Sequence, residues 1–372
     1  MPSLGAYLLV GLVAAVVTFA TTPLVIRLAR RRGWVVEPDA RRVHTVTTPD
    51  VGGMAMFAGF AAAFVVAWSM GSFDELFSRN SEPVGVVIAA ALMFLVGFVD
   101  DVREISAPAK VVGTVVVAVA LVYFGVTMFF FRVPFLDVYL LSNDWVPLIT
   151  VVWLLGMTNA INLIDGLDGL AAGIVAIGAG AFFLYSQRLV DPAIGALTMP
   201  NVGPLVAVVT VGICLGFLPH NFNPARVFMG DGGALLLGLL MAVSTSVVGG
   251  RADPNTQRFV GQTYFFLAPL FIPLFILGVP ILDTLFAIIR RAAKRQGVAS
   301  ADKGHLHHRL MEMGHGQRRS VLILWGWTGL LSAFVLYPVY TGSGVGYVPV
   351  GAAMLGLLLY TVLHPQIRRR RS

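Results

Sequence analysis

The chain contains eleven apolar segments, each about long enough to cross a bilayer as a helix, that alternate with short polar segments. Only 12% of its 372 residues are charged and 57% are hydrophobic, whereas a soluble globular protein carries about 25% charged residues. We therefore predict an all-α polytopic membrane protein in which residues 1–372 form a single domain. The predicted spans lie at about 4–29, 51–70, 83–99, 108–125, 144–160, 169–188, 203–218, 233–249, 263–289, 320–338 and 345–363.

The positions of the basic residues indicate how these spans are oriented. If the N-terminus lies outside, 21 of the 26 Lys and Arg residues fall in the predicted inner loops and the C-terminal tail. This is the bias that the positive-inside rule describes, so the net charge of +7 reflects membrane topology and not a nucleic-acid partner. We predict an outer N-terminus and a cytosolic C-terminus.

Four polar segments fall on the same side of the membrane, because each span reverses the direction of the chain. They are VDDVREISAPAK after the third span, NLIDGLDGL after the fifth, HNFNPARVFMGDGG after the seventh and ADKGHLHHRL after the ninth. The last of these lies in a predicted cytosolic loop at 291–319. The outer loops contain no comparable group of Asp, Asn and His residues. We expect the four segments to form one cytosolic site.

The first two polar segments supply carboxylates and amides. Asp100 and Asp101 end a span, where the helix dipole disfavours acids, so metal binding or proton transfer is the better explanation. In NAINLIDGLDGL, residues Asn159, Asn162 and Asp165 recur every three positions along one helix face. Two glycines, Gly166 and Gly169, allow a ligand to approach the backbone. Asp168 also suits the N-cap of the next helix.

The third segment places an acid where a new span begins. Asp231 fits an N-cap, and it also fits a Mg²⁺ ligand beside a phosphate at a helix N-terminus. Phe228 stands three residues earlier and fits either packing or stacking on a nucleotide base.

The fourth segment carries His305, His307 and His308 next to the cationic Arg309. Their HxHH spacing is not one of the usual zinc-ligand spacings, and no cysteine is near. Imidazoles among cationic residues favour binding of a diphosphate.

These motifs, in this order, resemble the polyprenyl-phosphate N-acetylhexosamine-1-phosphate transferases. The resemblance runs from His44 and VGG through VDD, NxxNxxDGxDGL and NPARVFMGD to HLHHRL. It implies transfer of a sugar 1-phosphate from a UDP-sugar to a polyprenyl phosphate at the cytosolic face of the bacterial cytoplasmic membrane, with release of UMP. Mg²⁺ is the implied cofactor, with Mn²⁺ as a substitute. One departure is Asp50, where many relatives carry a basic residue, so this position is a poor phosphate ligand.

The resemblance also implies roles for individual residues. Asp231 and Asp165 are expected to bind the metal, and Asp100, Asp101 and Asp231 to be catalytic. The expected substrate-binding residues are Asn159, Asn162, Asp165, Gly166, Leu167, Asp168 and Phe228 on the uridine side, and Lys110, His305, His307, His308 and Arg309 on the phosphate and sugar side. DKGHLHHRL is closer to the N-acetylglucosamine branch than to the muramoyl-pentapeptide branch, which stays the alternative together with other UDP-sugars.

The chemistry leaves two routes and one other class of protein open. Both reactants are anions, so a metal ion and cationic residues must offset their repulsion. The lipid phosphate has a second pKa of about 6 and can attack directly, with Asp100 or Asp101 as proton acceptor. A covalent aspartyl-phosphate is the rival route.

An ion-coupled transporter would place its acids near the bilayer midplane, where only Asp283 stands. A CDP-alcohol phosphotransferase would need a DGxxAR motif, which is absent. The sequence leaves a homodimer open.

Overall fold

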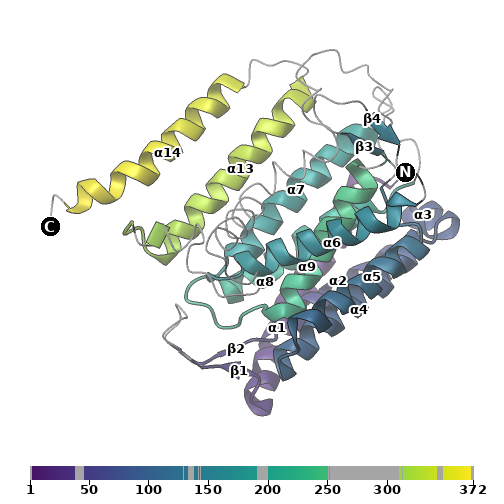
Figure 1. Cartoon of the computed structure of the whole chain (residues 1–372), viewed down its shortest axis with the longest axis horizontal. Coiled ribbons are helices and arrows are strands. Elements are labelled where there is room, and N and C mark those ends of the chain that lie inside the picture. Colours follow the sequence, from purple (N-terminus) through teal and green to yellow (C-terminus); the bar gives the residue numbers. More distant parts are fainter. Residues whose placement is uncertain are drawn as a thin grey trace.

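The computed structural model describes residues 2–37, 46–128, 130–132, 138–140, 142, 144–190, 200–249, 251, 310–311, 313–341 and 347–369. This part of the chain is a bundle of long helices with two short two-stranded ribbons (Figure 1). The helices are α1 Leu4–Arg32, α2 Gly53–Ser69, the 3₁₀ turn η1 Gly71–Phe73, α3 Asp74–Arg79, α4 Glu82–Arg103, α5 Ala107–Tyr123, α6 Trp145–Ile164, α7 Leu170–Val190, α8 Gly203–Asn221, α9 Gly230–Gly249, α13 Gln317–Thr341 and α14 Tyr347–Arg369.

Ten of the eleven predicted apolar windows coincide with helices, namely α1, α2, α4 to α9, α13 and α14. The window at 263–289 lies outside the described residues. Seven of the described helices are long and apolar enough to cross a membrane, and α2 with its continuation through η1 and α3, bent by 86°, makes an eighth. The apolar helix α5 and the apolar part of α14 are shorter. The predicted class, an all-α polytopic membrane protein, is confirmed.

The sequence predicts an all-α fold, but the first polar loop forms one short ribbon. In it β1 (Val35–Val36) pairs antiparallel with β2 (Thr48–Pro49). Strands of two residues are too short to give an alternating pattern, which is why the sequence did not reveal them. A second ribbon, β3 (Phe130–Arg132) with β4 (Val138–Leu140), lies at the opposite end of the bundle (Figure 1).

Contacts at the helix termini define two ends of the bundle. Where α4 ends, Asp101 contacts Asp231 at the beginning of α9. Where α4 begins, Glu82 forms an ion pair with Arg251, which follows α9. The two helices are therefore antiparallel. We call the end that holds Asp101 and Asp231 the acidic end.

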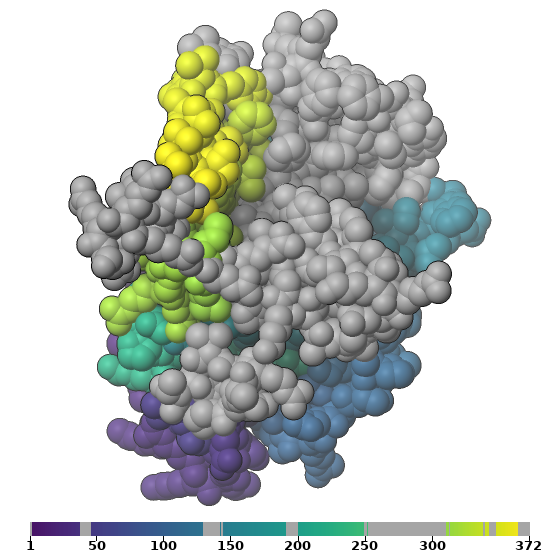
Figure 2. Space-filling model, turned by 60° about the vertical axis from the view of Figure 1, so that its left-hand side comes forward, coloured from purple at the N-terminus to yellow at the C-terminus, as the bar shows by residue number. Residues whose placement is uncertain are grey.

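α9 is the central helix of the described bundle (Figure 1). It packs against α4, α6, α8, α2 and α7, and nearly all of its side chains are buried. A helix that is apolar on every side requires such surroundings. α14 instead packs on α13 at the edge of the molecule, as Figure 2 shows in yellow and yellow-green. Because α9 is enclosed, a polar residue in its first turn lies among the ends of its neighbours.

Candidate active site

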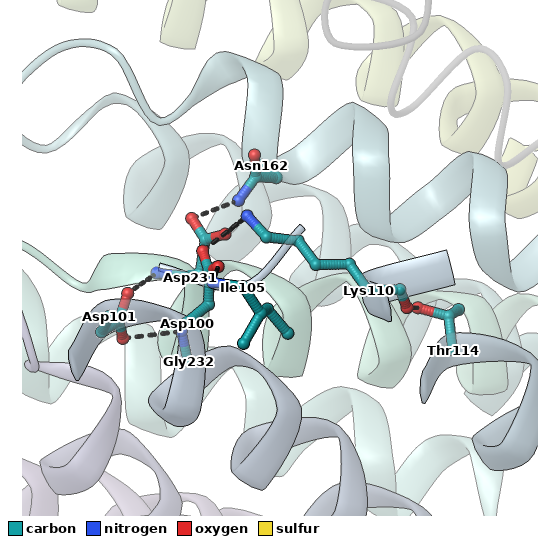
Figure 3. Close-up of polar contacts among 8 residues, drawn as sticks. All are labelled: Asp100, Asp101, Ile105, Lys110, Thr114, Asn162, Asp231 and Gly232. Atoms are coloured by element: carbon teal, nitrogen blue, oxygen red, sulfur yellow. Dashed lines mark hydrogen bonds and ion pairs between the residues drawn. The ribbon is translucent and has the colours of Figure 1, made fainter. Parts of the chain in front are cut away.

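Lys110 connects carboxylates from two other helices (Figure 3). Its Nζ lies 2.5 Å from Oδ2 of Asp100 and 2.5 Å from Oδ2 of Asp231. Lys110 belongs to the first turn of α5, Asp100 to the last turn of α4 and Asp231 to the first turn of α9. The two carboxylate side chains are only 13% and 25% exposed, so water screens their charges weakly. Two carboxylates and one ammonium leave this group with one excess negative charge.

The remaining oxygens of the two carboxylates are also occupied. Asn162, near the end of α6, donates its amide Nδ2 to Oδ1 of Asp231 at 2.8 Å. The backbone N–H of Ile105 donates to Oδ1 of Asp100 at 2.8 Å. Side chains from α4, α5, α6 and α9 therefore meet at one point, which we call the central cluster: Asp100, Lys110, Asn162 and Asp231 (Figure 3).

Asp101 lies beside the central cluster but faces the backbone of α9. Its Oδ1 accepts a hydrogen bond from the N–H of Asp231 at 2.6 Å, and its Oδ2 accepts one from the N–H of Gly232 at 3.0 Å. The sequence suggested an N-cap role for Asp231, but Asp101 supplies the carboxylate that satisfies these N–H groups. A carboxylate at a helix N-terminus is favoured by the dipole, which offsets its unfavourable place at the end of α4.

A glycine makes this contact between α4 and α9 fit. A Cβ atom at Gly97 would lie 2.5 Å from the carbonyl of Asp231, closer than real side chains approach a backbone. Gly230, which begins α9, has a φ of +66°, a conformation that favours glycine. The two glycines let the last turn of α4 reach the first turn of α9.

Asp165 follows the last residue of α6 and is partly buried. Burial raises the pKa of Asp165 well above its usual range, and the neighbouring carboxylates of Asp50, Asp231 and Asp168 raise it further. Asp165 therefore shares an acidic environment with Asp231, and its role as a metal ligand stays a prediction. Asp50, for which no role in metal binding was predicted, belongs to the same environment. Such a surplus of negative charge disfavours phosphate and favours a cation.

Asp168 makes contacts that the sequence did not predict. Its Oδ2 accepts hydrogen bonds from the side-chain amide of Asn223 at 2.9 Å and from the N–H of Ala225 at 3.0 Å. These bonds join the turn between α6 and α7 to the loop between α8 and α9. Sequence reasoning missed Asn223. The only signal was the density of polar residues in NFNPAR.

The other predicted residues of this turn lie in different surroundings. Asn159 is exposed, and its amide donates to the carbonyl of Leu155 in its own helix at 2.7 Å, so it is not part of the central cluster. Leu167 is buried in the hydrophobic core, whereas Gly166 is exposed. Gly169 has a φ of +77°, a conformation that favours glycine, and the predicted approach of a ligand to it stays a prediction.

Phe228 lies in the loop that leads into α9, and its backbone is held by the first polar loop. Its N–H donates to the carbonyl of Pro49 at 2.8 Å, and its carbonyl accepts from the N–H of Gly52 at 2.9 Å. The VGG motif therefore packs against the segment before Asp231. His44, Asp283, His305, His307, His308 and Arg309 lie outside the described residues.

The donors of the central cluster suit Mg²⁺. All of them except Lys110 are carboxylate or amide oxygens, and the Lys110 ammonium already shows that Asp100 and Asp231 can share one cation. In the described part of the chain no three His, Cys, Asp or Glu side chains are arranged to hold a metal by themselves. Mg²⁺ commonly takes only one or two carboxylates and completes its shell with water and substrate phosphate.

Comparison with known proteins identifies a family and several relatives. Residues 83–249, from α4 to α9, match the family model described as Glycosyl transferase family 4. The chain is 36% identical to the decaprenyl-phosphate N-acetylglucosaminephosphotransferase of Mycolicibacterium smegmatis, over 97% of this chain and 89% of that protein. It is 37% identical to the probable undecaprenyl-phosphate N-acetylglucosaminyl 1-phosphate transferase of Bacillus subtilis, over 87% and 83%.

A second group of relatives is more distant. The phospho-N-acetylmuramoyl-pentapeptide-transferase of Staphylococcus haemolyticus is 29% identical, over 63% of this chain and 74% of that protein.

Proposed function

The chain belongs to glycosyl transferase family 4, among its polyprenyl-phosphate N-acetylglucosamine-1-phosphate transferases, and we propose that it transfers N-acetylglucosamine 1-phosphate from UDP-N-acetylglucosamine to a polyprenyl phosphate. The products are UMP and a polyprenyl diphosphate sugar. The observation that carries this proposal is the convergence of Asp100, Lys110, Asn162 and Asp231 at one end of an apolar bundle. A lipid phosphate and a nucleotide both need such a place, where polar groups border the hydrocarbon.

The excess negative charge of the central cluster supports a requirement for Mg²⁺. Two unit charges 4 Å apart interact by about 4 kcal/mol at an effective dielectric constant near 20. Each phosphate charge that approaches the carboxylates would meet a barrier of this size. Asp231 would hold the ion, with Asp165 or Asp100 nearby, and Mn²⁺ would substitute for it. When bound, the metal offsets the charge of the two phosphorylated substrates.

Lys110 would bind substrate phosphate once the carboxylates have another counter-ion. Its ammonium sits at the start of α5 and is 33% exposed, so it is within reach of a ligand at the acidic end. Lysine binds phosphate as a point charge and does not require a fixed approach direction. Asn162 would keep Asp231 oriented, since its amide holds Oδ1 while Oδ2 faces the cation position.

We favour direct attack of the lipid phosphate on the sugar-bearing phosphorus. A phosphate monoester is largely dianionic at neutral pH, so no protein nucleophile is needed. We assign the role of proton acceptor to Asp100, because it lies in the central cluster beside Lys110, whereas both oxygens of Asp101 hold the backbone of α9. Exchange of labelled UMP into the UDP-sugar without lipid acceptor would favour the covalent route instead.

We propose that the acidic end faces the cytosol in a bacterial cytoplasmic membrane. The three arginines Arg30–Arg32 form the last turn of α1, and the next aromatic residue, Trp34, packs on Phe98 near the end of α4. Basic residues thus gather at the acidic end, as the positive-inside rule requires. α9 ends at the opposite end and α13 begins at the acidic end, as a topology of eleven spans requires.

The experiment that tests the function uses purified protein with polyprenyl phosphate and a panel of UDP-sugars. We expect release of UMP with UDP-N-acetylglucosamine and none without the lipid phosphate. Activity only with UDP-N-acetylmuramoyl-pentapeptide would move the chain to the second group of relatives. An ion-coupled transporter would release no UMP with any of these sugars.

A further inference from the structure

The side chain of Asn223 forms hydrogen bonds with two segments that are far from it in the sequence. Its Nδ2 donates to Oδ2 of Asp168 at 2.9 Å and to Oε1 of Gln317 at 2.8 Å. Its Oδ1 accepts from Nε of Arg318 at 3.1 Å, and the same Nε reaches the backbone carbonyl of Asn223 at 3.1 Å. One amide therefore joins the α6–α7 turn, the α8–α9 loop and the beginning of α13.

The α8–α9 loop depends on these bonds in the stretch between its apolar anchors, Phe222, which packs on Trp325, and Val227. From Asn223 to Arg226 every residue is exposed or only partly buried, and Val227 is the first that is fully buried. Further polar contacts hold the same stretch. Ala225 donates its N–H to Asp168, and Asn221 donates its amide to the carbonyl of Val227 at 2.9 Å.

This loop leads directly into the site. Phe228 and Asp231 follow it, and the backbone of Phe228 is fixed on its other side by Pro49 and Gly52. A shift at the Asn223 side would therefore rotate the segment that carries Phe228, while Asp231 is held separately by Lys110, Asn162 and Asp101. The segment that carries Phe228 and the residue Asp231 are therefore held by different contacts.

We infer that Asn223 is a positioning residue that sets the donor nucleotide subsite by locking the α8–α9 loop to Asp168 and to α13. The inference rests on the proposed function. The Oδ2 of Asp168 serves two N–H donors of the loop, so this residue also holds the loop, beside the uridine-side role that the resemblance implies for it.

Exchange of the two side chains tests this contact. Asn223→Asp alone sets a carboxylate against Asp168 and removes the donor, and Asp168→Asn alone weakens the acceptor. We expect Asn223→Asp to raise the KM for UDP-N-acetylglucosamine about tenfold while kcat changes by less than about threefold. In the double variant Asp168→Asn/Asn223→Asp, the amide introduced at position 168 donates to the carboxylate introduced at position 223. We expect its unfolding temperature to return towards the wild-type value, because the hydrogen bond between the two positions is restored.

A matched control separates positioning from general stability. Asn201 makes similar bonds at the opposite end of the bundle, to the carbonyl of Val247 and from the N–H of Gly203. Asn201→Ala should lower the thermal unfolding temperature without changing the KM. The KM for the polyprenyl phosphate should stay constant in all of these variants.

Several results would overturn the inference. One is a double variant that unfolds at as low a temperature as Asn223→Asp, since the loop then does not depend on this hydrogen bond. Others are a fall in kcat at constant KM, or an equal KM change in Asn201→Ala. A double-mutant cycle on the unfolding temperature, which needs no substrate, should show coupling between positions 168 and 223. Absence of that coupling refutes the inference alone, whereas a wild-type protein that releases no UMP refutes the proposed function.

Discussion

Asp101 and Asp231 are joined by a hydrogen bond of 2.6 Å that runs from the backbone N–H of Asp231 to the carboxylate of Asp101. The acid at the end of α4 thus holds the first turn of α9, and with it the residue that we expect to bind the metal. Its neighbour in the sequence, Asp100, contacts Lys110 instead. Adjacent residues on a helix point about 100° apart, so the pair divides into one orienting and one charge-bearing acid.

Replacing Asp101 distinguishes these tasks. Asp101→Ala leaves two N–H groups at the start of α9 without their acceptor, which should cost about 1 kcal/mol of stability and lower turnover. Asp101→Asn keeps one oxygen that can accept from one of these N–H groups, so it should retain clearly more stability and more turnover than Asp101→Ala. Unfolding temperature and UMP release measure the two effects. Equal and complete loss of activity in both variants would instead make Asp101 the proton acceptor.

Replacing Lys110 should change metal binding and turnover in opposite directions. Lys110→Met keeps the length of the side chain but removes the cation that Asp100 and Asp231 share. We expect tighter binding of Mn²⁺, measured by electron paramagnetic resonance, because the metal no longer competes with the ammonium. UMP release should fall about 100-fold, since the phosphate loses a positive partner. Weaker binding of Mn²⁺ would contradict this account.

Asp165 should make stability depend on pH. Its pKa in the folded protein is raised above that of the unfolded chain, which is near 3.9, so it favours folding below that pH and this contribution is lost as the pH rises. Asp165→Asn removes the ionisation. Without metal, the variant should unfold at a higher temperature than wild type at pH 7, and the difference should shrink towards pH 4. A variant that is less stable at pH 7 would show that the carboxylate is stabilised by neighbours other than acids.

Asp231→Asn should abolish activity without preventing assembly in the membrane. The amide can still contact Asn162, but it carries no charge for a metal ion or for Lys110. We expect UMP release to fall at least about 100-fold, equivalent to about 2.7 kcal/mol of transition-state stabilisation. Asp144→Asn, at an exposed carboxylate before α6, is the matched control and should remain active. Near-normal turnover of Asp231→Asn would remove the metal role from this residue.

Metal dependence itself is tested by chelation. Excess EDTA should stop UMP release, and Mg²⁺ or Mn²⁺ added beyond the chelator should restore it. Ca²⁺ prefers longer bonds and more ligands, so it should restore less. Full activity in excess chelator would mean that Lys110 and other cationic residues offset the substrate charge alone.

The sequence predicted which segments would meet, because span parity does not depend on side-chain detail. It predicted that Asp100, Asn162 and Asp231 lie at one end of the bundle, and the structure confirms this. It also predicted nearly every described helix, since each requires a long apolar run. The cytosolic side of this end and the roles of the residues stay predictions.

The hydrogen-bond or ion-pair partner of each side chain could not be predicted from the sequence. Lys110 was expected on the phosphate side, but nothing in its spacing revealed that it would lie between two acids. Asn223 was assigned no role, and its partners stand 55 and 94 positions away. Such contacts follow from how helix ends are packed, which no local pattern encodes.

The place of Asp231 at the head of α9 has a consequence for biosynthesis. Its partners Asp100, Lys110 and Asn162 belong to helices that leave the ribosome earlier, so until α9 arrives the Lys110 ammonium has only one of its two carboxylate partners. A chain released before α9 is made contains most of the described bundle but lacks Asp231, so its central cluster is incomplete. The central cluster is thus completed in a single step, when the helix that the others surround is inserted among them.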